Sequence, residues 1–216
     1  MLFARLLMII LLMFAMVFLS AGTFDYWEAW VYLSIFLIPI FISAFYWLKK
    51  DPELLERRMR RKEKETAQKL IMKITYFHLL LAILLPGFDK RFGWSNVPVE
   101  WIIIADILVL LGYGMVFLVL RENRYACHTI EVEQEQKVVG SGLYAIVRHP
   151  MYLGVSLMYI LTPLSLGSYW AMIPSIVMIP VLVARIRNEE SILIKELEGY
   201  QEYMQKTRYR LIPGIW

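Results

Sequence analysis

The sequence predicts an all-α protein whose helices form a polytopic bundle in a membrane. Of the 216 residues, 59% are hydrophobic and only 19% are charged, whereas soluble domains have roughly 45 to 50% apolar and about 25% charged residues. The apolar residues are gathered into long runs, and the loops between the runs alternate in charge. Such runs face lipid, so the composition excludes an ordinary soluble domain.

Six apolar runs predict about six membrane helices, because ~20 helical residues span ~30 Å of hydrocarbon. They cover residues 2–20, 29–47, 70–85, 99–120, 150–166 and 169–186, and the third and the last two are short. Only Gly167 and Ser168 separate the last two runs, which predicts an antiparallel helical hairpin over residues 150–186. Its two open ends must then lie on one side of the membrane. Apolar side chains at three- and four-residue spacing follow and predict an amphipathic tail helix: Leu193, Leu197, Tyr200 and Met204.

The charges of the loops predict which side of the membrane each loop occupies. Residues 21–28 carry Asp25 and Glu28 but no Lys or Arg, whereas residues 48–70 are rich in both. Because positively charged loops stay in the cytosol, we expect both termini there, in a bacterial inner membrane or a eukaryotic endoplasmic reticulum. We expect the first run to be retained and not cleaved as a signal peptide, since its removal would break this alternation.

The basic segment, residues 48–70, also contains acidic residues and a weak apolar face. It therefore predicts a surface helix lying against anionic lipid headgroups. Nucleic-acid binding is not expected, because no aromatic residues are interleaved with the charges. The single cysteine, Cys127, excludes an intramolecular disulfide and leaves no cysteine cluster for a metal.

Two ionisable residues lie inside the apolar runs, His78 in the third and Asp106 in the fourth. A charge at that depth is costly, which makes each a functional candidate. A hydrogen bond to a neighbouring helix would explain each of them equally well. Both interpretations stay open at this stage.

The first polar cluster is the segment 140–154, which reads as a turn followed by a helix that begins near Pro150. His149 would then lie near the helix N-terminus, with Arg148 just outside the lipid. A helix N-terminus offers unpaired amides and partial positive charge, which suit a carboxylate ligand. The alternative is an ordinary start of a membrane helix, with Arg148 and Tyr152 as interfacial anchors.

The second cluster closes the last apolar run with Arg185, Arg187, Glu189 and Glu190. These side chains could simply be positive-inside anchors and solvated carboxylates. The hairpin argues against complete independence, because it makes His149 and Glu190 neighbours in space. Two such clusters at the cytosolic lipid interface make a plausible pocket.

Together the two clusters resemble a known family. The run Gly142-x-Tyr144-x3-Arg148-His149-Pro150-x-Tyr152-x-Gly154 is followed by Arg185-x3-Glu189-Glu190, then by Gly199, Tyr203 and Arg210-Leu211-Ile212-Pro213. This composite resembles the isoprenylcysteine carboxyl methyltransferase family over roughly residues 120–216. The wider superfamily also holds phospholipid and thiol methyltransferases and sterol reductases. The chain would accordingly divide into membrane helices with the basic loop (residues 1–120) and a methyltransferase core (residues 121–216).

The resemblance implies that S-adenosylmethionine binds in a cytosolic pocket without a Rossmann domain. The family's cofactor contacts fall on Gln136, Lys137, Val138, Val139, Tyr144, Arg148, His149, Pro150, Met151, Tyr152, Glu189 and Glu190. The family often has His at the position of Gln136, so this chain departs from the pattern there. The arginine that holds the acceptor carboxylate falls on Arg185 or Arg187, and spacing alone does not choose between them.

The residue types suit this chemistry. Glu190 can pair with the cofactor's ammonium, His149 and backbone donors can bind its carboxylate, and Tyr144 or Tyr152 can face its adenine or its sulfonium. A carboxylate acceptor is already ionised near neutral pH, so no general base is required and positioning dominates. We therefore expect methyl transfer to a lipid-like carboxylate of the prenylcysteine type. The alternatives are an amine or thiol acceptor, a nicotinamide-dependent reductase, and a non-catalytic scaffold or transporter.

Overall fold

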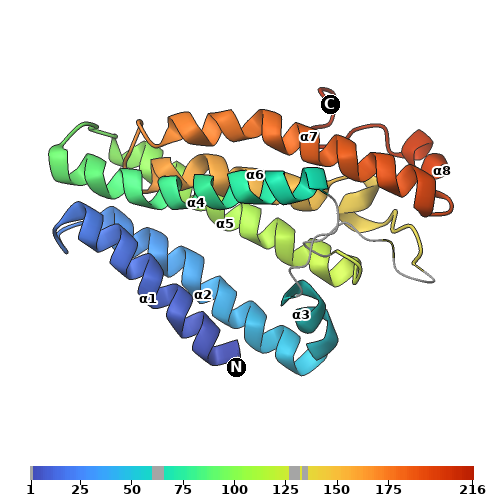
Figure 1. Ribbon diagram of the computed structural model, residues 1–216, viewed down its shortest axis with the longest axis horizontal. Helices are drawn as coiled ribbons and strands as arrows, with labels where there is room; N and C mark the ends of the chain where they lie inside the picture. Colours follow the sequence, from blue (N-terminus) through green and yellow to red (C-terminus); the bar gives the residue numbers. More distant parts are fainter. Residues whose placement is uncertain (1, 60–65, 127–131, 133–135) are drawn as a thin grey trace. The chain divides into compact units, whose positions relative to one another are not determined.

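The structure is a computed structural model that describes residues 2–59, 66–126, 132 and 136–216. Within these residues it contains eight α-helices, one short 3-10 helix and no strand, which confirms the all-α prediction (Figure 1). Cys127 and four cations of the basic segment, Arg60, Arg61, Lys62 and Lys64, lie outside the described residues. The helices are α1 (Leu2–Ala21), α2 (Trp27–Lys50), α3 (Pro52–Met59), α4 (Thr66–Phe92), α5 (Val99–Glu122), η1 (Gly142–Ala145), α6 (Pro150–Ser165), α7 (Met172–Glu196) and α8 (Tyr200–Lys206).

Three helical segments in the described part of the chain are long and apolar enough to cross a membrane: Trp27–Lys50, Gln68–Phe92 and Val99–Glu122. Leu7–Ala21 and Pro150–Ser165 are apolar but shorter. Helix α7 begins only at Met172 and meets its first charge at Arg185, so its apolar part falls short of the ~20 residues that a span needs. The chain is a membrane protein. Six membrane helices are not confirmed, and the predicted sidedness of the loops stays a prediction.

The helices form two compact units, and each unit draws on three stretches of the chain. The first contains Met1–Phe41, Ile74–Leu111 and Leu157–Met178. Its core packs α1 against the start of α2 through Val17, Phe18, Ala29 and Leu33. Tyr26 adds a hydrogen bond of 2.6 Å to the carbonyl of Leu166. The proposed division of function between residues 1–120 and 121–216 stays a prediction.

The connection between α6 and α7 also lies in the first unit. It comprises residues 166–171 and is longer than the two residues expected, because Ser168 accepts a hydrogen bond from the Ala171 amide before α7 begins. Gly167 adopts a φ of 72°, a left-handed conformation that favours glycine. The buried carboxylate of Asp89 accepts hydrogen bonds from Ser95 and Ser168 and so holds this turn.

His78 and Asp106 are both buried in the first unit. The Nε2 atom of His78 lies 2.9 Å from the Ser175 hydroxyl on α7. This contact matches the structural alternative, a polar side chain bonded to a neighbouring helix. Neither residue is among those that line the cavity described below.

The second unit contains Ile42–Lys73, Gly112–Ser156 and Ile179–Trp216. Trp47, Leu54 and Leu120 form one of its cores. Helices α5 and α6 approach closely here, since a Cβ atom added to Gly154 would lie 2.6 Å from the carbonyl oxygen of Gly112. Glycine at position 154 therefore has a packing role at the start of α6.

The predicted tail helix is in fact two helices, which corrects the expectation of one. Leu193 belongs to α7, which ends at Glu196, while Tyr200 and Met204 belong to α8. Gly199 separates the two helices with a φ of 82°, a conformation outside the helical region. The second core of this unit, formed by Leu197, Tyr200 and Tyr203, lies at this break.

Candidate functional site

The C-terminal tail holds the start of α6 in place. The amides of Arg148 and His149 donate hydrogen bonds of 2.9 Å to the carbonyls of Tyr209 and Arg210. Pro150 occupies the first position of α6, where a missing amide hydrogen costs nothing. The amides of residues 148 and 149 are thus already engaged, which leaves any backbone contact with a ligand carboxylate to the amides that follow in the first turn.

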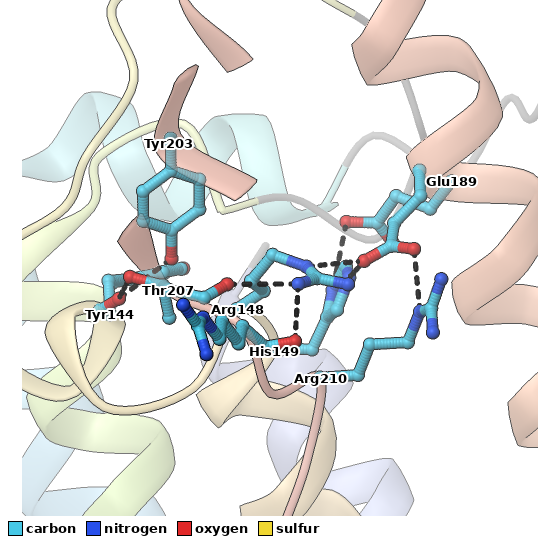
Figure 2. Close-up of polar contacts among 9 residues, drawn as sticks. Tyr144, Arg148, His149, Glu189, Tyr203, Thr207 and Arg210 are labelled. Carbon is cyan, nitrogen blue, oxygen red and sulfur yellow. Dashed lines mark hydrogen bonds and ion pairs between the residues drawn. The ribbon is translucent and has the colours of Figure 1, made fainter. Parts of the chain in front are cut away.

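Glu190 is the centre of a buried charge network in which the two predicted clusters meet. Arg148 and Arg210 each donate through Nε to one of its oxygens at 2.7 Å. His149 Nε2 lies 3.2 Å from the Glu190 carboxylate, which can only accept, so this nitrogen carries the proton. The predicted proximity of His149 and Glu190 is therefore present in the structure, and Figure 2 shows the side chains of Arg148, His149 and Arg210 close together.

The same network attaches the tail to the cluster. Arg148 also donates through Nη1 to the carbonyls of Thr207 and Arg208, at 2.9 and 2.7 Å. Its side chain and that of Glu190 are both 4% exposed. A buried guanidinium with these partners is an internal structural link and not a surface anchor.

The electrostatics of Glu190 follow from these contacts. Burial alone would raise the pKa of this carboxyl group, but hydrogen bonds from His149, Arg148 and Arg210 outweigh it and lower the pKa to about 2. Glu190 is therefore ionised at neutral pH. Three donors surround its negative charge, and it is not among the residues that line the cavity.

A second set of hydrogen bonds is centred on Tyr152, which lies on the first turn of α6. Its hydroxyl donates to Glu189 at 2.5 Å and accepts from the Nε of Arg185 at 2.8 Å. The Arg185 guanidinium also lies against the Tyr152 ring, 5.8 Å from its centroid. Arg185 is half-buried, while Arg187, two residues further along α7, is exposed.

Beside these clusters lies a cavity of about 830 Å³, part of which is open to solvent. Polar, aromatic and aliphatic side chains all contribute to its lining. The lining residues are Asn123, Tyr125, Ala126, Gln136, Lys137, Val138, Val139, Tyr144, Arg148, His149, Met151, Tyr152, Glu189, Leu193, Leu197, Tyr200 and Tyr203.

Several tyrosines line the cavity. The Tyr203 hydroxyl donates to the carbonyl of Tyr144 at 2.8 Å (Figure 2), and the Tyr144 hydroxyl accepts from Asn123 at 3.0 Å. Burial raises the pKa of Tyr203 to about 12 and also raises the pKa of Tyr200. The Tyr200 hydroxyl is buried and has no hydrogen-bond partner among the described residues.

Most of the residues that the sequence singled out line this cavity. They are Gln136, Lys137, Val138, Val139, Tyr144, Arg148, His149, Met151, Tyr152 and Glu189. Four others do not line it: Pro150, which starts α6, Glu190, Arg185 and Arg187.

Sequence reasoning missed seven lining residues: Asn123, Tyr125, Ala126, Leu193, Leu197, Tyr200 and Tyr203. Leu193, Leu197 and Tyr200 had been assigned to the apolar face of a tail helix. Nothing in their spacing separates an apolar face that meets lipid from one that meets a cavity. Tyr203 carried a usable signal, since it lies in the motif that resembles the methyltransferase family.

The described part of the chain is an all-helical membrane protein with a cavity that charged and aromatic side chains line. Residues 102–195 match the family model described as the isoprenylcysteine carboxyl methyltransferase (ICMT) family. The match includes both polar clusters and confirms the resemblance that their motifs carry. It supports methyltransferase activity in a membrane. A search of curated proteins finds no match to the chain.

Proposed function

We propose that the protein is an S-adenosylmethionine-dependent membrane methyltransferase that acts on the carboxylate of a lipid-like acceptor of the prenylcysteine type. One observation carries the proposal: a single cavity gathers the Glu189 carboxylate, the cations Lys137 and Arg148, and several tyrosines. S-adenosylmethionine has an ammonium, a carboxylate, an adenine and a sulfonium, and each has a complement in this set. When bound, the cofactor supplies an activated methyl group.

The unpaired hydroxyl of Tyr200 supports a polar ligand in this cavity. A buried hydroxyl without a partner costs about 1 to 3 kcal/mol. Tyr200 lines the cavity and has no partner in the described part of the chain. A ligand that offers a hydrogen-bonding group would recover that cost.

Glu189, not Glu190, is the better partner for the cofactor's ammonium. Glu190 is enclosed by Arg148, His149 and Arg210, whereas Glu189 lines the cavity and its side chain is 22% exposed. Glu190 then acts as the group that orients His149 and Arg148 toward the cavity. The sequence-based assignment of the ammonium to Glu190 is replaced in this proposal.

Arg185 is the better candidate for the acceptor carboxylate. It contacts Tyr152, which lines the cavity, while Arg187 is exposed. A planar, permanently charged guanidinium orients a carboxylate through paired hydrogen bonds. One acceptor oxygen then forms a bond to the methyl carbon as the carbon–sulfur bond breaks. The nucleophile is already ionised, so the chain needs no general base for this step and works by positioning.

Ligand-dependent melting of the purified protein in detergent tests the cofactor. We expect S-adenosylhomocysteine to stabilise the protein, by about 2.7 kcal/mol at a concentration 100 times Kd, and NADP to have no effect. Stabilisation by NADP alone would favour a reductase. No effect from either ligand would favour a scaffold or transporter, and both results contradict the proposal.

A further inference from the structure

The Tyr152 hydroxyl forms hydrogen bonds with two charged side chains of α7, Arg185 and Glu189. Arg185 Nε donates to it at 2.8 Å, and it donates to Glu189 Oε2 at 2.5 Å. The direction of both bonds is determined by chemistry. A guanidinium can only donate and a carboxylate can only accept, so the one hydroxyl proton points to Glu189 and an oxygen lone pair points to Arg185.

This bridge joins two subsites that have different ligands in the proposed function. Glu189 faces the cofactor's ammonium and Arg185 faces the acceptor carboxylate. The two residues are four apart on one helix, so they share a face of α7. Tyr152 comes from the other arm of the hairpin, on the first turn of α6.

We infer that Tyr152 is a positioning residue that couples acceptor binding to cofactor binding, an inference that rests on the proposed function. While the acceptor subsite is empty, the positive charge of Arg185 polarises the Tyr152 hydroxyl and strengthens its hydrogen bond to Glu189. An acceptor carboxylate bound to Arg185 neutralises this charge and weakens that hydrogen bond. Glu189 then interacts more strongly with a cationic ligand, so each ligand raises the affinity for the other.

The structure also indicates that the coupling depends on the hydroxyl and not on the ring. The centroid of the Tyr152 ring lies 5.8 Å from the Cζ atom of Arg185 and 5.7 Å from the centroid of the His149 ring. Tyr152→Phe keeps that body and removes only the bridging oxygen. Arg185, Glu189 and the packing of the first turn of α6 are retained.

The test is a binding cycle with S-adenosylhomocysteine and N-acetyl-S-farnesylcysteine, which together form a complex that cannot react. Calorimetric titration measures Kd for S-adenosylhomocysteine with and without saturating farnesylcysteine. For the wild type we expect the acceptor to lower this Kd by roughly five- to tenfold, within the usual range of coupling. For Tyr152→Phe we expect the ratio of the two Kd values to fall close to one. Turnover by this variant should show a raised acceptor KM and a smaller change in kcat.

Tyr144→Phe is the matched control. It removes a hydroxyl from the same cavity, but one that accepts from Asn123. This variant can bind S-adenosylhomocysteine with a different affinity from the wild type. The ratio of its Kd values without and with farnesylcysteine should nevertheless equal that of the wild type. Melting temperature without ligand confirms that both variants are folded.

The outcomes separate the inference from the proposed function. If the wild type binds both ligands and Tyr152→Phe keeps the full ratio, the inference is wrong and the proposed function stands. A wild type that binds both ligands without any coupling also overturns the inference. If the wild type binds no S-adenosylhomocysteine, the proposed function itself fails.

Discussion

Replacing Glu190 with Gln should destabilise the protein by about 3 kcal/mol at neutral pH. The change keeps the shape of the side chain but removes the charge that Arg148 and Arg210 share at 2.7 Å. Arg148 is buried, so it would lose its counter-charge in a place where water cannot replace it. Breaking a buried ion pair in this way costs about 3 to 5 kcal/mol.

The same contacts also lower the pKa of Glu190, and the size of that shift corresponds to a similar free energy. A value of about 2 in the folded protein, against an ordinary value of 4.5, corresponds to about 3 kcal/mol of stability when the group is ionised. Because the folded pKa is lowered, this contribution is complete above pH 4.5 and is lost as the pH falls toward 2. The advantage of the wild type over Glu190→Gln should therefore shrink across that range.

Unfolding in detergent, followed from pH 7 to pH 2, measures this advantage. Glu189→Gln is the matched control, because the Glu189 carboxylate accepts a hydrogen bond from the Tyr152 hydroxyl. The ion pairs of Arg148 and Arg210 are with Glu190 instead. We expect the control to lose only about 1 kcal/mol, typical of a single hydrogen bond. A Glu190→Gln variant as stable as the control, with an unchanged pH dependence, would refute the view that Glu190 is the centre of the buried charge network.

Three further predictions follow from the same unit. Gly154→Ala should lower both stability and activity, because its new Cβ would lie 2.6 Å from the Gly112 carbonyl; unfolding and turnover measure this, and a wild-type melting temperature would contradict it. Glu189→Gln should weaken S-adenosylhomocysteine binding about 10-fold or more, the value of a charge-assisted contact, as calorimetric titration will show. Arg185→Lys should raise the acceptor KM much more than it changes cofactor affinity, whereas Arg187→Lys should change neither; equal kinetics for both variants and the wild type would make these arginines topology anchors.

The meeting of the two polar clusters could be predicted from the sequence, because a short turn between two apolar runs returns the chain to its starting side. That reasoning places His149 near Glu190, which the structure shows at 3.2 Å. It assigned the cofactor's ammonium to Glu190, whereas Glu189 is the carboxylate that lines the cavity. Adjacent residues on a helix point about 100° apart, and only the packing of α7 decides which carboxylate faces the cavity.

The role of the C-terminal tail could not be predicted at all. Residues 209 and 210 bind the start of α6 through their backbone carbonyls, and such contacts leave no pattern in side-chain types. The break between α7 and α8 was hidden for a different reason. Apolar spacing continues through Gly199 as if the helix did, and only the positive φ of that residue reveals the turn.

Six membrane helices are not confirmed, and α7 shows how an apolar run in the sequence and the boundaries of a helix can differ. The apolar run includes Tyr169 and Trp170, but these residues lie in the turn before Met172. Near the other end, Arg185 is a charge within the helix. The apolar composition therefore predicts one segment over residues 169–186, whereas α7 begins only after the turn, at Met172.

Methyl transfer itself tests the central claim most directly. The purified protein is incubated with methyl-radiolabelled S-adenosylmethionine and, separately, with prenylcysteine, phospholipid and thiol acceptors, and the products are then treated with base. We expect label in the prenylcysteine sample and its release as volatile methanol, since a methyl ester is cleaved by base and a methylated amine or thioether is not. Base-stable label confined to the phospholipid or thiol, or no transfer to any acceptor, would contradict the account.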